Sequence, residues 1–180
     1  MTDFVLVSHP DFPGTAIRSI TVEATRTGDG ALKLEYCVTG AIDQVRWPEW
    51  KGVRQADRLW EHSCFEAFVG MVDEGGYIEL NFSTSGEWAA YRFAAYRAEM
   101  QAIEGGLATG GRTFSDGEMR VRRTVRLSDF ADGDWRLGLS AIIEEVDGGK
   151  SYWALAHPPG KPDFHAAICF AGRLAAPAGE

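Results

Sequence analysis

Six polar or aromatic side chains between residues 62 and 92 are of the types that hold a small polar ligand. They combine an indole, a guanidinium, an amide, an imidazole and two carboxylates, whereas an ordinary solvated sheet face carries mostly Thr, Lys, Glu and Ser. The charged and amide groups offer directed hydrogen bonds, and the flat indole can stack on a sugar or a base. We expect these residues to form a ligand-binding surface: His62, Glu66, Glu79, Asn81, Trp88 and Arg92.

The elements that must position these residues are three successive strands, predicted at 64–72, 77–83 and 87–93. Each run alternates with period two, which is typical of a strand with two different faces. The sequences DEGG (73–76) and STSG (83–86) are predicted as the two hairpin loops between them.

The assumed loops fix which residues face each other. A four-residue DEGG loop places Phe68 opposite Asn81 and Glu66 opposite Ser83, and an STSG loop places Asn81 opposite Trp88. The predicted ligand residues then share one face, with His62 at the strand entrance. The opposite face is predicted to be apolar and buried: Phe65, Ala67, Val69, Ile78, Leu80, Phe82, Ala89, Tyr91 and Phe93.

Other interpretations of the polar face stay open. It would also suit a solvated sheet with an Arg–Glu cross-strand pair and a half-covered Trp. Glu66 and Glu79 would serve as the acid–base pair of a sugar-active enzyme, although carboxylates beside an arginine are more often a binding arrangement. No metal site is predicted, because His157 and His165 are eight residues apart across prolines and a site with His62 would have to be assembled in three dimensions.

The rest of the chain favours an all-β fold. Short strand-like runs recur with Gly, Asp and Pro between them, which is typical of an antiparallel β-sandwich of jelly-roll type. A helix is conceivable only at 94–104, and the stretches 40–58, 105–117 and 157–165 are predicted as long loops. Besides the three central strands, runs are predicted near 4–7, 17–26, 31–39, 119–127, 135–145, 151–156 and 168–174.

Composition narrows the classes of function. With 180 residues the chain is expected to form one domain over 1–174 with a flexible tail at 175–180. The net charge of −8 argues against nucleic acid and anionic membranes as partners. Neither a signal peptide nor a transmembrane run is recognisable, so we expect a cytoplasmic protein. Three cysteines without CxxC spacing are expected to be inert thiols.

The central motifs also support a resemblance to a known family. LWEHSCFEAFV (59–69), YIELNFSTSGEWAAYRF (77–93) and SYWALAHPPGKPDFHAAICF (151–170) together resemble the bacterial DOMON-like proteins, relatives of carbohydrate-binding module family 9. The resemblance runs from about residue 17 to 174. It implies a β-sandwich whose concave face binds a sugar or a haem, with Glu66, Asn81, Trp88 and Arg92 at positions that contact sugar.

The resemblance leaves two ligands to compare. Haem-binding relatives use an axial Met and an axial His, but Met71 and Met119 are predicted on core faces and no His lies on a strand opposite them. We therefore expect a non-catalytic protein that binds a carbohydrate-like ligand and has no cofactor. A haem-binding redox domain, a sugar-active enzyme using Glu66 and Glu79, and a structural module that forms homodimers are the alternatives.

Overall fold

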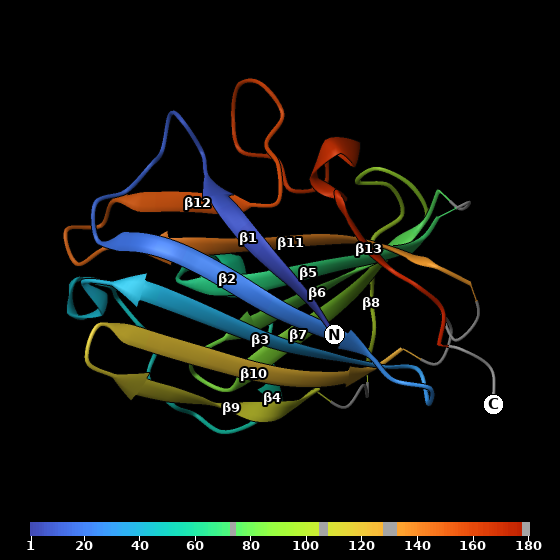
Figure 1. The fold of residues 1–180 in the computed structure, drawn as a ribbon, viewed down its shortest axis with the longest axis horizontal. Helices are drawn as coiled ribbons and strands as arrows, with labels where there is room; N and C mark the ends of the chain where they lie inside the picture. Colours follow the sequence, from blue (N-terminus) through green and yellow to red (C-terminus); the bar gives the residue numbers. More distant parts are fainter. Residues whose placement is uncertain (73–74, 105–107, 128–132, 178–180) are drawn as a thin grey trace.

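Two β-sheets that share strand β1 pack face to face in the computed structural model, which describes residues 1–72, 75–104, 108–127 and 133–177 (Figure 1). The first sheet has the order β1-β2-β3-β10-β9. Its strands are β1 (Thr2–Ser8), β2 (Ile17–Arg26), β3 (Ala31–Gly40), β10 (Glu118–Arg126) and β9 (Ala108–Ser115).

The second sheet lies behind the first in Figure 1 and has the order β4-β7-β6-β5-β11-β12-β1. Short strands β13 (Gly172–Leu174) and β8 (Gln101–Ala102) pair with β11 and β7. The main strands are β4 (Arg54–Gln55), β7 (Glu87–Phe93), β6 (Tyr77–Ser83), β5 (Cys64–Met71), β11 (Trp135–Glu144) and β12 (Lys150–Ala154). Three 3₁₀ turns complete the described elements: η1 (Ile42–Gln44), η2 (Leu59–Glu61) and η4 (Ala167–Cys169).

Strand β1 joins the two sheets at one edge. Its residues 2–6 pair with β2, whereas Val7 and Ser8 pair with Ala154 and Trp153 of β12. The predicted all-β fold is confirmed, but it is not strictly antiparallel, because Arg54 and Gln55 of β4 run parallel to β7. None of the helices among the described residues is long and apolar enough to cross a membrane.

A single large apolar core fills the space between the sheets. The predicted inward residues Phe65, Val69 and Leu80 are almost wholly buried there, as is Phe82. The alternating runs of β2, β3 and β10 contribute the opposing side chains. They include Tyr36, whose hydroxyl donates to the Glu66 carbonyl over 2.6 Å. Because each main strand buries one face in this core, the two sheets must pack with these faces toward each other.

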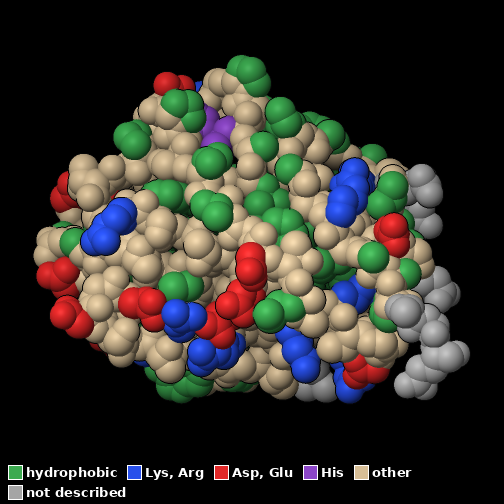
Figure 2. Space-filling model, in the orientation of Figure 1, with side chains coloured by type: hydrophobic (Ala, Val, Ile, Leu, Met, Phe, Trp, Pro, Cys, Tyr) green, Lys and Arg blue, Asp and Glu red, His purple; other side chains and the backbone are tan. Residues whose placement is uncertain are grey.

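The outer face of the first sheet is charged. Arg120 and Arg122 of β10 both pair with Glu35 on β3. Figure 2 shows Lys and Arg interspersed with Asp and Glu on this side of the molecule. Exposed pairs of this kind contribute little to stability, so this face is an ordinary solvated surface.

Two segments differ from the sequence prediction. Residues 94–104 form no helix; they turn tightly, with Arg97 and Glu99 at positive φ, and then supply strand β8. The predicted loop at 105–117 contains strand β9, while its residues 105–107 lie outside the described part, as do 73–74 of the DEGG loop and 178–180 of the tail. Strand β9 needs Gly at position 110, because Gly110 has φ 148° and a Cβ there would come within 1.9 Å of the Arg122 carbonyl oxygen.

The register between the central strands also differs from the prediction. On β5 and β6 Glu66 is opposite Asn81, a shift of two residues that leaves every side chain on its predicted face. On β6 and β7 Phe82 is opposite Trp88, because residues 84–86 form a three-residue loop with Gly86 at φ 88°. This shift of one residue turns every side chain of β7 to the opposite face.

Candidate functional site

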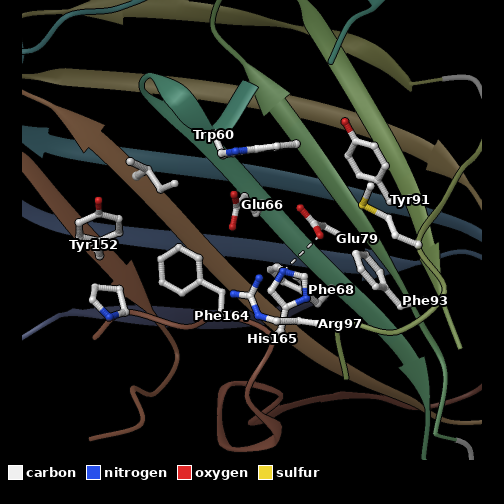
Figure 3. Close-up of a pocket in the computed structure, with 13 residues that line it drawn as sticks. Trp60, Glu66, Phe68, Glu79, Tyr91, Phe93, Arg97, Tyr152, Phe164 and His165 are labelled. Carbon is white, nitrogen blue, oxygen red and sulfur yellow. Dashed lines mark ion pairs between the residues drawn. The ribbon is translucent and has the colours of Figure 1, made fainter. Parts of the chain in front are cut away.

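The outer face of the second sheet, which points away from the core, carries a cavity of about 510 Å³. Figure 3 shows two carboxyl groups, from Glu66 and Glu79, near its centre, with aromatic side chains around them. Strands β5, β6, β7, β11 and β12 and the segment 157–170 supply the walls. The lining residues are Trp60, Glu66, Phe68, Glu79, Tyr91, Phe93, Arg97, Met100, Ile142, Tyr152, Pro162, Phe164 and His165.

Glu66 forms part of the cavity floor and is almost completely buried, with 3% of its surface exposed. It projects from the middle of β5, between β6 and β11, and its Oε2 accepts a hydrogen bond from the Ser140 hydroxyl over 3.0 Å. Burial, together with the nearby charge of Glu79, raises the pKa of Glu66 to about 8. At neutral pH this carboxyl is therefore mostly protonated and can donate as well as accept a hydrogen bond.

Glu79 lies beside Glu66 on strand β6 and is held by neutral groups. Its Oε1 accepts a hydrogen bond of 2.7 Å from the Asn81 amide, and its Oε2 lies 3.5 Å from Nε2 of His165. Burial raises the pKa of Glu79, although the Asn81 hydrogen bond and the positive charge of Arg97 oppose the shift. Both carboxyl groups of the floor therefore have raised pKa values, as is common at functional sites.

His165 connects the floor to the segment that covers one side of the cavity. Its Nδ1 lies 2.7 Å from the Tyr77 hydroxyl, and its ring meets Phe68 and Phe93 edge-on at 5.2 and 5.1 Å. Burial, reinforced by the charge of Arg97, lowers the pKa of His165 to about 4. The imidazole is therefore neutral at physiological pH and acts as a polar wall rather than a cation.

Arg97 and Asp163 close this side of the cavity with an ion pair. Nη2 of Arg97 lies 2.8 Å from Asp163 Oδ1, and the Tyr96 hydroxyl donates to Asp163 Oδ2 over 2.6 Å. Burial acts against ionisation of Asp163, but the bonds from Tyr96 and Arg97 outweigh it and hold its pKa below the usual value. The contact joins the turn after β7 to the Pro-rich segment, two parts of the chain that are far apart in sequence.

Aromatic rings form the remaining walls. Trp60 from η2 meets Tyr91 of β7 at 5.9 Å between ring centroids, and Tyr152 of β12 meets Phe164 at 6.2 Å. The hydroxyl of Tyr91 donates to Asp57, which holds this ring in place. In Figure 3 these rings lie on opposite sides of the two carboxyl groups, so a bound molecule would meet polar groups below and aromatic faces at the sides.

The structure brings together three of the six predicted ligand residues. Glu66 and Glu79 line the cavity, and Asn81, fully buried, supports Glu79 from beneath. The expectation that Trp88 and Arg92 share their face is wrong, because the three-residue loop before β7 reverses that strand. Trp88 instead packs in the core between the sheets, and Arg92 is exposed opposite Ile78.

His62 and the loop at 40–58, which carries Trp47 and Trp50 and was expected as an alternative rim of the site, are also absent from the cavity lining. His62 is exposed and its Nδ1 contacts Glu144 Oε2 at 2.7 Å. Trp47 donates its indole N–H to the Ile42 carbonyl and packs against the core, and Trp50 lies near Gly86. The loop at 40–58 therefore closes the end of the core instead of framing the cavity.

Sequence reasoning assigned several lining residues to the wrong face or to no site. Tyr91 and Phe93 were expected in the core because of the assumed register, and Arg97 was expected in a possible helix. The Pro-rich stretch 157–165 did carry a signal, since stiff long loops often frame ligands, and it supplies Pro162, Phe164 and His165.

The cavity does not fit the axial ligation expected of a haem-binding relative. Met119 is buried in the core and Met71 packs against it, so only Met100 reaches the cavity. His165 also lines it, but its Nδ1 is bonded to Tyr77 and its Nε2 faces Glu79. An axial histidine needs a ring nitrogen free to reach iron, and here both nitrogens are directed at protein groups.

No protein-family model matches this chain, and no curated protein matches its sequence. Its fold is shared with solved structures. A putative carbohydrate-binding protein from Bacteroides uniformis ATCC 8492 superposes with a TM-score of 0.66 and 17% identity, over 97% of this chain and 86% of that one. A family 9 carbohydrate-binding module from Caldicellulosiruptor kristjanssonii, in complex with glucose, gives 0.53 and 11%, over 90% and 78%. Identities this low establish a common fold and no correspondence between individual site residues.

Proposed function

We propose that this protein is a non-catalytic binding protein for a small carbohydrate, and that the cavity over Glu66 and Glu79 is its site. The observation that carries the proposal is the combination of a hydrogen-bonding floor with aromatic walls in one cavity of about 510 Å³. A cavity of this size and lining suits a small molecule with both polar and apolar surfaces. The carbohydrate-binding names of the two structural neighbours support the same class of ligand.

Each part of the cavity has a role in this proposal. The rings of Trp60 and Tyr91 cover the C–H faces of a sugar and remove them from water. The floor exchanges hydrogen bonds with the hydroxyls, because the protonated Glu66 donates and accepts while Glu79 accepts. Since Ser140 and Asn81 fix the two carboxyl groups before a ligand arrives, little conformational entropy is lost on binding.

Isothermal titration calorimetry against a panel of mono- and disaccharides tests the proposal. Wild type is expected to bind at least one sugar, and Trp60→Ala is expected to weaken that binding by about tenfold or more, because it removes a stacking face. Trp50→Ala is the matched control, since Trp50 is exposed and outside the cavity lining. Absence of binding to every sugar at millimolar concentration, or equal loss in both variants, would contradict the proposal.

A second candidate, a sugar-active enzyme, is favoured by one observation. Glu66 keeps its proton near neutral pH beside a second carboxyl group, as a general acid in glycoside hydrolysis must. Release of chromophore from nitrophenyl glycosides by wild type, lost in Glu66→Gln and in Glu79→Gln, would favour this candidate. Tight sugar binding without turnover would exclude it.

A further inference from the structure

The charges around the cavity do not balance when it is empty. Glu66 and Glu79 project into it from β5 and β6, and the one Lys or Arg among its described lining residues is Arg97. Arg97 is already paired with Asp163 over 2.8 Å. In the described part of the chain neither Glu66 nor Glu79 has a salt bridge from Lys or Arg. If the carboxyl groups of Glu66, Glu79 and Asp163 and the guanidinium of Arg97 were all ionised, these four groups would carry two uncompensated negative charges.

The groups that hold the two carboxyls are neutral. Ser140 from β11 donates to Glu66 and Asn81 donates to Glu79, while His165 beside Glu79 is uncharged at neutral pH. Tyr91, on the neighbouring strand β7, is engaged with Asp57. Buried carboxylates without a cation are costly, so the empty protein lowers this cost by retaining a proton on Glu66.

The aromatic walls also favour a ligand with a positive charge. Trp60, Tyr91, Phe93, Tyr152 and Phe164 surround the carboxyl groups in Figure 3. The faces of such rings attract cations, most strongly where water is excluded, and ring clusters beside carboxylates are suited to ammonium groups. A neutral sugar would use the rings for stacking but would bring no positive charge to the two carboxyl groups.

Resting on the proposed function, we infer that the ligand carries a protonated amine, and that it is an amino sugar whose ammonium group lies between Glu66 and Glu79. The pyranose C–H faces then stack on the walls while the ammonium N–H groups donate to both carboxylates. The proton that Glu66 holds in the empty protein passes to the buffer as the ammonium group takes its place. Binding of the amino sugar therefore releases protons, whereas binding of a neutral sugar releases none.

Calorimetry with three sugars of related shape tests this inference: glucosamine, N-acetylglucosamine and glucose at pH 6.5, each in two buffers of different ionisation enthalpy. Glucosamine is expected to bind about tenfold or more tightly than either neutral sugar. Its apparent enthalpy is expected to depend on the buffer in the sense of proton release. Glu66→Gln is expected to remove both the preference and the release, and Glu49→Gln, on an exposed loop, is expected to retain them.

The possible outcomes separate this inference from the proposed function. If glucose or N-acetylglucosamine binds as tightly as glucosamine, the amino-sugar assignment is overturned and the carbohydrate function stands. If choline binds and no sugar does, both are overturned, because the site then selects a cation without a sugar ring. Should Glu66→Gln fail to fold, the buffer dependence of wild type decides alone, and glucosamine binding without proton release overturns the inference.

Discussion

Asn81 faces Glu66 directly across strands β5 and β6, yet its amide donates to Glu79, two residues earlier on its own strand, over 2.7 Å. Glu66 takes its own hydrogen bond from Ser140 on the opposite side. The two carboxyl groups therefore lie side by side with separate neutral donors, and no donor is shared between them. Both carboxyl groups line the cavity.

Replacing Glu66 should change how stability depends on pH. Its folded-state pKa of about 8 lies above the unfolded value of 4.5, so the contribution of Glu66 to stability is fully present below pH 4.5 and is lost as the pH rises toward 8. Glu66→Gln has no such loss. We therefore expect the free energy of unfolding of the variant, relative to that of wild type, to rise by on the order of 2–4 kcal/mol between pH 5 and pH 8.5. Denaturant unfolding at the two pH values measures this change. Parallel stability curves for the two proteins would show that Glu66 is ionised in the folded state.

Removing a ring from the core should be costly. Phe82 is fully buried between the sheets, and Phe82→Ala leaves a cavity that is expected to lower the free energy of unfolding by about 3–5 kcal/mol. Val146→Ala, at an exposed site, should change it by less than about 0.5 kcal/mol. Urea unfolding of the two variants measures the difference, and a loss below ~1 kcal/mol for Phe82→Ala would contradict the observed face assignment.

Two adjacent glycines of β9 should respond in opposite ways to the same substitution. Gly110→Ala forces a Cβ to within 1.9 Å of the Arg122 carbonyl oxygen at φ 148°, and should destabilise the protein by about 2 kcal/mol or more. Gly111→Ala meets nothing within 4 Å and should be neutral or slightly stabilising. Thermal unfolding of both variants provides the comparison. Equal effects would mean that β9 does not pair with β10 in the observed register.

Trp88 should matter for folding and little for binding. Because its indole packs in the core, Trp88→Phe is expected to cost about 1–2 kcal/mol of stability and to leave ligand affinity within roughly twofold of wild type. Trp60→Phe is expected to show the reverse, since Trp60 lines the cavity. Titration and chemical denaturation of this pair distinguish the observed register from the one expected from sequence. A tenfold loss of affinity in Trp88→Phe would support the latter.

Local patterns predicted most of the strands, and their failures have physical causes. The alternation of apolar and polar residues was sufficient to predict β2, β3, β5 and β6, because one face of each strand is buried in the same core. Strand β9 was missed because a Gly-rich composition is typical of a loop, whereas in the structure Gly110 permits a close approach to the backbone of β10. The faces of β7 depended on whether its loop has three or four residues, and the serines and glycine at 83–86 are compatible with both.

The candidate site was predictable only where it lies on regular strands. Glu66, Glu79 and Asn81 come from two adjacent strands whose alternation is clear, and an error of two residues in register did not separate them. Arg97 and His165 come from segments without periodic pattern, and tertiary contacts position them: Asp163 holds Arg97, and Tyr77 holds His165. No short-range pattern in the sequence encodes such contacts.

Strand β1 occupies the seam between the two sheets, and this position protects the molecule from association. Its first part covers the backbone edge of β2 and its last part covers that of β12, which belongs to the opposite end of the sequence. Detachment of this one strand would expose two unpaired edges at once, and unpaired edges recruit strands from other chains. The pairing of β1 with β12 can also form only after β12 has been made, so nascent or nicked forms of this protein should be the ones most prone to aggregate.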